Sequence, residues 1–519
     1  MEMLIFIDNM GKQITQIINR FDGGLSEDKR VKSSNKFSLT KHFDAFTYPH
    51  KLVPYRSTEA NEDKTFNIVK FLYAPYITGH ALYGLGVDVG TTKPCLYIYD
   101  IDTAFPTWSG GSWLKSPTTD RDTEVLFYYK NYVYVWAGNG RYLQRVDITS
   151  PTNDFSTIAN GDFSAAGTVA QPVHHPADDT AYFFYNNKVY KLSGTTWCDG
   201  GTDPVLTLPD NLSIVSACAY GNYLAIACST KGTTDYQSIV FLWDRDSSLT
   251  TLSERIDFGA GRIVHLANLA GRLTAVIDYY ISGSRGAAAS GKIVIRQYLG
   301  GQFAATVNEI ESDTAGGSNT LPKVRYQKDD KLYFAAKPKL NGDFRHGIWV
   351  VDSNGRVTLD YIEEEVADNS SYQGIYQVGN IWFIAHSGDG SVNRTNDQAV
   401  YTYTSIYESL ILDGNDSSTK KKLLGVSVMT EPLVSNDDLS LVLKYRKDSD
   451  LDGSWTTILT RTITNADENS HSAINIESTG VNLPEFNEIQ FRIESKSGSY
   501  APVITGLKFQ YEVLDNLPY

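Results

Sequence analysis

The chain has 519 residues and a formal net charge of −14, and this length allows two or three domains with substantial cores. The acidic balance argues against a protein that reads nucleic acid or binds anionic membranes, since both need a basic surface. Aromatic residues reach 12%, with 33 Tyr, while charged residues make up only 20%, and there are 41 Gly. This composition favours strands and tight turns over long helices.

The first 65 residues form a leader before any repeated pattern begins. Apolar residues at helical spacing predict one short amphipathic helix there, namely Ile14, Ile17, Ile18 and Phe21. A polar stretch and an extended run follow, in which Pro49 and Pro54 disfavour helix. Such an arm can clasp a neighbouring molecule, close a sheet or pack on its own domain. We expect the propeller to fold without residues 1–60.

A short pattern recurs through residues 66–422, in which a turn of Gly, Asn or Asp precedes an apolar and aromatic strand. The copies start at His80, Asn131, Asn187, Asn222, Gly271, Asp330 and Asn380, at a mean spacing of 50 residues. The interval from Asn187 to Asn222 is only 35 residues, so this unit is truncated or the copy is misplaced. Strand, tight turn, strand, loop and strand at this period predict a β-propeller of about seven blades. The alternative is a generic antiparallel protein with evenly spaced hairpins.

Residues 423–519 change to alternating strands separated by turn residues, which predict a C-terminal β-sandwich. A polar run from Asp413 to Lys422 marks the joint. The predicted fold is therefore all-β, with residues 1–65 as helix and arm, 66–422 as propeller and 423–519 as sandwich.

Cysteine use and hydropathy bound the compartment. Four Cys are too few for a disulfide framework. Cys218 and Cys228 flank a predicted turn and could meet across a ladder, but we expect two small buried thiols. The start of the chain lacks a basic segment followed by a long apolar run, and no stretch approaches the roughly 20 apolar residues of a membrane span. We expect synthesis and folding in the cytoplasm.

No sequence motif for catalysis is present, so we expect no enzyme and no catalytic residue or cofactor-binding residue. His174 and His175 are adjacent in a predicted loop between Pro172 and Pro176. Two adjacent His could bind a metal, but adjacent side chains in an extended segment should point opposite ways, so we do not expect a metal site there. Glu363, Glu364 and Glu365 form a solvated acidic edge.

One loop has the beginning of a calcium site. Asp448, Asp450 and Asp452 stand at positions 1, 3 and 5, and Gly453 stands at position 6. Position 12, where a calcium loop needs Glu, is Leu459. The loop is therefore first a hairpin whose Asp side chains cap backbone amides, and second a candidate Ca²⁺ site through these three Asp residues.

Segments near both ends are similar to virion structural proteins of tailed bacteriophages. They are residues 19–30, 41–44, 49–56, 82–86 and 502–513. The resemblance implies a building block of a phage tail, such as a tail nozzle or tail-tube adaptor that contains a β-propeller. It also implies a homo-oligomeric ring in the virion, contacts with neighbouring tail or portal proteins, and DNA that passes through without specific binding. An acidic wall would repel the phosphates of that DNA.

Two other functions remain open. The first is a tail protein that binds a receptor or carbohydrate, because Tyr- and Trp-rich loops stack well on sugar rings. The second is a glycoside hydrolase, which needs carboxylates that converge at the ring centre. The segments 109–113 and 193–197 resemble the small polar turn before Trp in sialidase-type repeats. Both lack the Asp of that turn, so we interpret them as ordinary blade turns.

Overall fold

The computed structural model has an all-β fold, as the composition predicts, and its described residues contain no α-helix. The residues described are 4–7, 13–26, 29–30, 35–61, 66–76, 79–88, 94–100, 114–115, 123–137, 142–149, 156–158, 167–198, 203–231, 236–246, 252–279, 290–313, 324–337, 339–340, 343–344, 346–362, 372–379, 381–386, 392–395, 401, 403–414, 416–432, 439–451, 453–463, 475–479, 483–497 and 502–514. Glu363–Glu365, Ser109–Trp113 and Asp452 lie outside this part of the chain.

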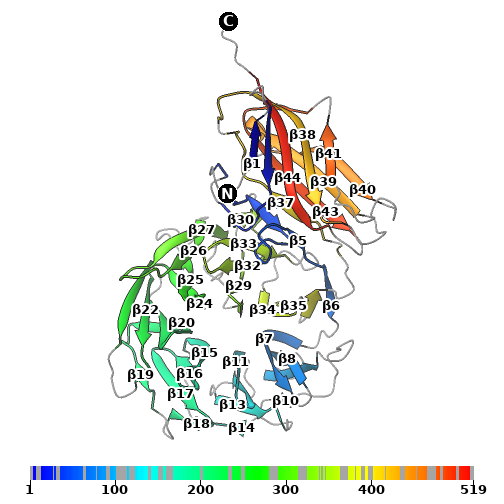
Figure 1. Ribbon diagram of the computed structural model, residues 1–519. Helices are drawn as coiled ribbons and strands as arrows, with labels where there is room; N and C mark the ends of the chain where they lie inside the picture. Colours follow the sequence, from blue (N-terminus) through cyan, green and yellow to red (C-terminus); the bar gives the residue numbers. More distant parts are fainter. Residues whose placement is uncertain are drawn as a thin grey trace.

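Antiparallel sheets that follow one another along the chain make up the larger part of the molecule (Figure 1). The first sheet contains β7 (Phe66–Tyr76), β8 (Gly79–Asp88), β9 (Pro94–Asp100) and β10 (Leu114–Lys115). The second contains β11 (Thr123–Tyr129), β12 (Tyr132–Ala137), β13 (Tyr142–Asp147) and β14 (Ser156–Thr157). The third contains β15 (Val169–His175), β16 (Thr180–Tyr185), β17 (Lys188–Ser193), β18 (Thr196–Trp197) and β19 (Leu206–Thr207). The next two contain β20 (Leu212–Tyr220), β21 (Tyr223–Thr230), β22 (Gln237–Trp243) and β23 (Glu254–Ala260); and β24 (Arg262–Leu269), β25 (Arg272–Tyr279), β26 (Ser290–Gln297) and β27 (Ala305–Asp313).

Two further sheets complete this series. One contains β28 (Arg325–Lys328), β29 (Lys331–Ala336), β32 (Gly347–Asp352) and β33 (Val357–Tyr361), with the short hairpin β30 (Lys339–Leu340) and β31 (Asp343–Phe344) inserted between β29 and β32. The last contains β34 (Tyr372–Val378), β35 (Ile381–His386), β36 (Val392–Thr395) and, at its outer edge, β6 (Thr58–Asn61) from the leader. The leader therefore closes a sheet, which was one of the roles open to it.

These sheets lie around a common centre like the blades of a propeller (Figure 1). A buried apolar cluster lies between each sheet and the next. The last sheet packs on the first in the same way, through Phe383 and Ala385 against Ile68 and Leu82. Each sheet can bury both faces because it has a neighbour on either side.

The irregular spacing at Asn187 has a structural cause. Six of the repeated motifs begin the second strand of a sheet, as Asn222 does for β21. Asn187, in contrast, lies in the turn between β16 and β17, so its motif begins the third strand of its sheet. The second strand of that sheet starts at Thr180, and its described residues form five strands, so the unit is not truncated. The motif was misplaced because both turns of this sheet carry polar residues of the same kind.

Two more sheets contain the C-terminal strands, and both also include strands from the leader. The first has the order β1 (Leu4–Ile7), β2 (Gln13–Ile18), β44 (Ile504–Val513), β38 (Lys421–Thr430) and β41 (Asn475–Thr479), with β42 (Glu485–Phe486) paired to β38. The second has the order β3 (Leu39–Lys41), β37 (Ser405–Glu408), β43 (Ile489–Ser497), β39 (Leu439–Lys447) and β40 (Thr456–Ile463). A two-stranded ladder of β4 (Phe43–Asp44) and β5 (Val53–Pro54) lies in the leader between β3 and β6.

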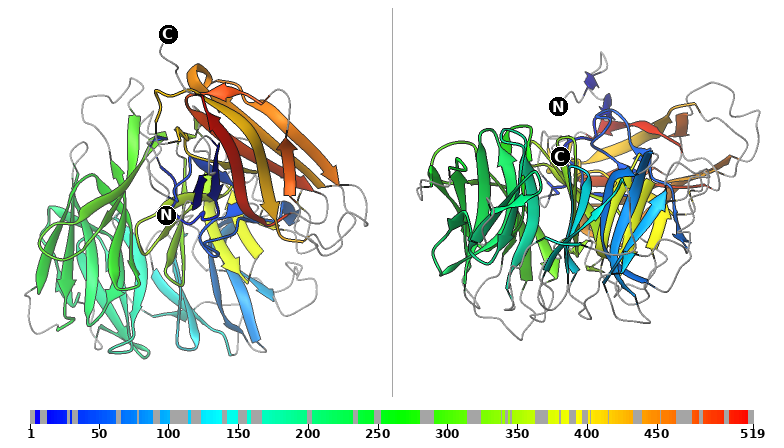
Figure 2. Two further views of the ribbon diagram at one scale, coloured as in Figure 1. Left: turned by 45° about the horizontal axis from the view of Figure 1, so that its top comes forward. Right: turned by 90° about the horizontal axis from the view of Figure 1, so that it is seen from below.

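The two C-terminal sheets share one apolar core outside the ring of sheets. Figure 2 shows these strands, in orange and red, packed beside the ring. Val426 and Phe509 of the first sheet meet Leu443 and Phe491 of the second. The rings of Phe491 and Phe509 lie 5.3 Å apart.

The leader differs most from its prediction. Ile14, Ile17 and Ile18 lie in strand β2, which pairs with β44, and not in a helix. Alternation along β2 brings Gln16 rather than an isoleucine fully inside, where its amide donates to the Tyr511 hydroxyl at 3.2 Å. The helical spacing of these isoleucines does not produce a helix, because the segment pairs as a strand with the long strand β44.

The boundary predicted between residues 422 and 423 does not coincide with the division between the ring and the C-terminal sheets. β37, at Ser405–Glu408, belongs to a C-terminal sheet although it lies within the stretch assigned to the propeller. Residues 1–60 contain β1–β5 and most of β6, and only β6 belongs to a ring sheet, so folding of the propeller without these residues stays a prediction.

Candidate functional site

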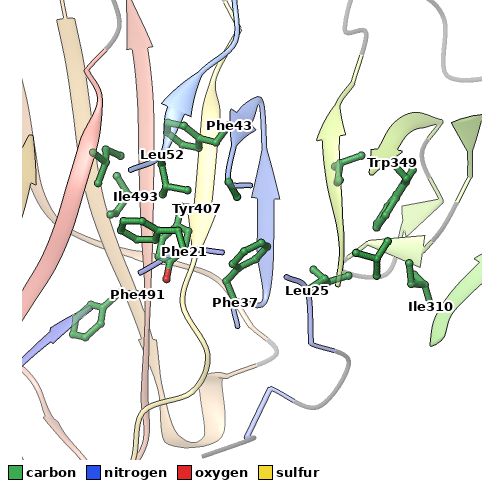
Figure 3. Close-up of a cluster of buried hydrophobic side chains, with 14 of the residues drawn as sticks. Phe21, Leu25, Phe37, Phe43, Leu52, Ile310, Trp349, Tyr407, Phe491 and Ile493 are labelled. Atoms are coloured by element: carbon green, nitrogen blue, oxygen red, sulfur yellow. The ribbon is translucent and has the colours of Figure 1, made fainter. Parts of the chain in front are cut away.

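The leader joins the ring of sheets to the C-terminal sheets through a continuous buried cluster. Figure 3 shows Phe21, Leu25 and Phe37 between Trp349 of the ring and Tyr407 of a C-terminal sheet. Phe21 is fully buried, and its ring meets that of Tyr407 edge-on at 5.3 Å. The ring of sheets and the C-terminal sheets are the two units of the molecule. They are therefore held together by side chains of the leader, and not only by direct contact with each other.

Backbone contacts fix the same segment against the outer strand of a ring sheet. The Leu25 amide donates to the Val357 carbonyl of β33 at 2.7 Å. Gly24 has a φ of +78°, and a Cβ atom at this position would lie 3.0 Å from the same carbonyl oxygen. Glycine is required here both for its backbone conformation and for this close approach.

An ionic cluster lies at the edge of this joint. The Asp22 carboxylate accepts from Arg356 at 2.8 Å, from Arg20 at 2.9 Å and from Asn35 at 2.5 Å. Arg356 also pairs with Asp352 at 2.6 Å, so the leader carboxylate is tied to the turn between β32 and β33. Burial opposes ionisation of Asp22, but the hydrogen bonds from the two arginines and Asn35 outweigh it and hold its pKa below the usual value.

A buried carboxyl lies on the neighbouring part of β33. Asp360 is 2% exposed and accepts from the Tyr55 hydroxyl of the leader at 2.8 Å. Burial, with a smaller effect from Asp44, raises the pKa of Asp360 well above its usual value. The carboxyl is therefore protonated over part of the pH range in which an exposed Asp is charged.

The Asp448 loop is a hairpin between β39 and β40, with the 3-10 turn η2 at Asp448–Asp450. Asp448 has a φ of +47°, and its Oδ1 accepts from the amides of Asn487 at 2.7 Å and Glu488 at 3.0 Å. Asp450 is exposed, and its carbonyl accepts from Gly453 at 2.8 Å. The structure thus gives Asp448 a backbone-capping role, and Ca²⁺ binding by Asp448, Asp450 and Asp452 stays a prediction.

The buried ammonium group of Lys421 lies near the Asp448 loop, because both contact the backbone of Asn487. Lys421 is 1% exposed, and its ammonium group donates to the carbonyls of Asp416, Thr419 and Asn487. Burial lowers the pKa of Lys421, and the surrounding acids, Asp416 first, oppose this. Within the described residues, no group of three or more His, Cys, Asp or Glu side chains is arranged to hold a metal ion.

The adjacent histidines point opposite ways, as expected for an extended segment. His174 is exposed and lies 3.0 Å from Asp179, whereas His175 is fully buried on β15. The Nε2 of His175 donates to the Tyr223 carbonyl at 3.0 Å, while its Nδ1 accepts from Arg245 at 2.5 Å. Burial, together with Arg245, lowers the pKa of His175, so the neutral ring links two neighbouring sheets. Sequence reasoning had no signal for this link, because Arg245 is distant in sequence.

All four cysteines are free and buried, and Cys218 and Cys228 are two small buried thiols, as expected. Register pairs Cys218 with Ala225 and Cys228 with Ile214, so the two do not face each other. Burial raises the pKa of Cys218 to about 12 and raises that of Cys228 as well. Neither thiol has the character of a nucleophile.

Comparisons with known proteins give remote structural similarity only. No family model matches the sequence, and no curated protein matches it. Similar solved structures include BamB from Moraxella catarrhalis, with 12% identity, 63% of this chain and 82% of that chain covered, and a TM-score of 0.32. A glycoside hydrolase has 11% identity and a TM-score of 0.23, and the match covers 87% of this chain and 100% of that chain. Kluyveromyces lactis Hsv2 has 9% identity, covers 77% and 99%, and has a TM-score of 0.34.

Similarity at these values says nothing about what this chain does. Across the part of the chain that the structure describes, no helix has the length and apolar character needed to cross a membrane.

Proposed function

We propose that this chain is a structural component of a bacteriophage tail, whose copies form a ring or nozzle around the DNA-ejection channel. In this proposal the ring sheets are the blades of a seven-bladed propeller, and the two C-terminal sheets form a β-sandwich. Support comes from the resemblance of the leader and of the final strand to phage virion proteins. The protein acts as a building block of the virion, made in the host cytoplasm, and carries out no reaction.

The observation that carries this proposal is the path of the leader. Strands β1, β2 and β3 extend the C-terminal sheets, and β6 extends the last ring sheet. Between them, Phe21 and Leu25 lie in the shared core. The leader fixes the ring of sheets and the C-terminal sheets to each other, and a ring of identical subunits under mechanical load needs such stiffness.

The same path changes the proposed mode of assembly. A leader that completes two units of its own chain is not free to exchange with a neighbour. Contacts between copies, and with neighbouring tail or portal proteins, would therefore come from the outer surfaces of the two units. The net charge of −14 suits a conduit, since acidic walls repel DNA phosphates and bind the passing DNA weakly.

Mass measurement in solution and electron microscopy test this proposal. Purified full-length protein should form particles of a fixed number of copies, and negative-stain images should show rotational symmetry. Mass spectrometry of purified virions of a phage that encodes the chain should detect it at a stoichiometric level. A protein that is monomeric at micromolar concentration and absent from the virions would overturn the proposal.

A further inference from the structure

The sheet that contains β43 carries charged and amide side chains on the face that points away from the core. Phe491 and Ile493 are buried in the core, so alternation places Gln490, Arg492 and Glu494 on the opposite face. Pairing with β37 and β39 brings three more side chains to that face, namely Glu408, Lys444 and Arg446. Outward faces usually carry exposed polar residues, but here Gln490 and Glu408 are fully buried.

These side chains hold one another in place. The Arg446 Nε donates to the Gln490 side-chain oxygen at 2.8 Å. Glu494 pairs with Lys444 at 2.8 Å and with Arg492 at 2.9 Å. The network spans the two neighbouring strands β39 and β43, so its charged groups are positioned before any ligand arrives.

Trp455 lies over this network. It directly precedes β40 and is partly exposed. The guanidinium carbon of Arg446 lies 4.4 Å from the centre of its ring, and that of Arg492 lies 5.5 Å away. Because both arginines rise from the sheet, the ring face that they contact is the one turned to the sheet. Trp455 keeps part of its surface exposed, and this part is available to a ligand.

The charges select the class of ligand. Register places five cations on this face, Lys41, Lys444, Arg446, Arg492 and Lys496, against two acids, Glu408 and Glu494. This local positive excess stands out on a chain whose net charge is −14. The two guanidinium groups already interact with the negative potential of the Trp455 ring, so a cationic ligand would bind weakly to the other face of this ring. A flat ligand with a negative charge matches both features.

We propose that Trp455 and the cations around it bind an acidic sugar, a pyranose ring that carries a carboxylate. The apolar face of the sugar ring stacks on the exposed part of the indole. Its carboxylate lies on the side of Lys444 and Arg492, which favour a negative group through charge-assisted hydrogen bonds. The site adds ligand binding to the scaffold proposed above and does not depend on tail assembly.

Calorimetric titration of the full-length protein tests the site with two probes. The probes are an oligogalacturonate, whose sugars carry carboxylates, and a neutral oligosaccharide of the same length. We expect heat of binding with the oligogalacturonate only, reduced by added salt because charged groups contribute. Trp455→Ala should lower the affinity at least tenfold. Trp455→Phe keeps a flat ring and should lose less, and Lys444→Gln should weaken oligogalacturonate binding.

Tyr48→Ala is the matched control, because Tyr48 is an aromatic residue of the leader that is 51% exposed. It should leave the affinity unchanged. No heat with millimolar oligogalacturonate would overturn the proposal, as would equal affinity of wild type and a folded Trp455→Ala protein, checked by circular dichroism. Equal binding of the neutral probe would overturn the role of the carboxylate. If Trp455→Ala does not fold, Trp455→Phe and Lys444→Gln decide, and unchanged affinity in both refutes the site.

Discussion

Replacing Asp22 by Asn should loosen the leader locally. The Asp22 side chain is 6% exposed, while its partners Arg356 and Arg20 are 29% and 40% exposed. Removal of one partner from a fully buried pair costs about 3–5 kcal/mol, whereas exposed pairs contribute about 0–1 kcal/mol. The Arg356 contact lies between these limits and the Arg20 contact counts as exposed, so we expect a loss of about 2 kcal/mol.

Hydrogen exchange is the suitable assay, because a protein of two units need not unfold in one step. The Leu25 amide, bonded to Val357, reports opening of the leader directly. A loss of about 2 kcal/mol corresponds to roughly 30-fold faster exchange for residues 20–26. Glu309→Gln removes an exposed pair with Lys292, 37% and 39% exposed, and should leave these amides unchanged. Less than a threefold change in Asp22→Asn would refute the reasoning.

Acid should reproduce the effect in the wild type. The pKa of Asp22 is lower in the folded protein than in the unfolded chain, where it is near 3.8. Its stabilisation is therefore complete above about pH 4 and is lost as the pH falls through the lowered value. Exchange at the Leu25 amide should accelerate over that range in the wild type, after correction for intrinsic exchange. It should not do so in Asp22→Asn.

Three further predictions concern buried groups. The folded protein binds the Asp360 proton more tightly than the unfolded chain, so stability should fall as pH rises above about 4. The urea midpoint of the wild type should therefore be lower at pH 8 than at pH 5, and Asp360→Asn should remove this difference. An equal difference in both proteins would count against the prediction. Cys218 and Cys228 should resist a thiol reagent at pH 8 in the native protein and react after denaturation, and rapid native reaction would contradict their burial. Phe21→Ala should cost about 3–5 kcal/mol at the joint, seen as faster exchange of residues 20–26, whereas a change below threefold would mean that Phe21 is not part of the joint.

Local patterns predicted the strands well and their partners poorly. The turn-and-strand motif at Asn222 predicted β21, because adjacent strands pair through a two-residue turn. The partner of β2 is β44, almost 500 residues away, and no local pattern encodes such a pairing. Isoleucines at positions 14, 17 and 18 fit helical spacing, but the free edge of β44 decides in favour of a strand.

The site residues show the same limit. The acidic loop at Asp448 was visible as a motif, but the amides that its side chain caps belong to residues 487 and 488, in the distant segment between β42 and β43. The stacking of Arg446 and Arg492 on Trp455 had no signal in the sequence, because it needs the register of two strands and the position of the next turn. Function that depends on a sheet face becomes visible only when strand order is known.

The path of the leader also constrains how the molecule forms. β6 is made early but pairs with β36, and β2 must wait for β44, at the end of the described chain. Such distant pairings carry a large loop-closure cost, so the ring of sheets gains its full stability only after β36 is made, and the C-terminal sheets only after β44 is made. Once formed, the segment between β2 and β6 binds Val357 on one side and Tyr407 on the other. Movement of one unit against the other must therefore break contacts of the leader, which makes the leader the part of the molecule that sets its stiffness.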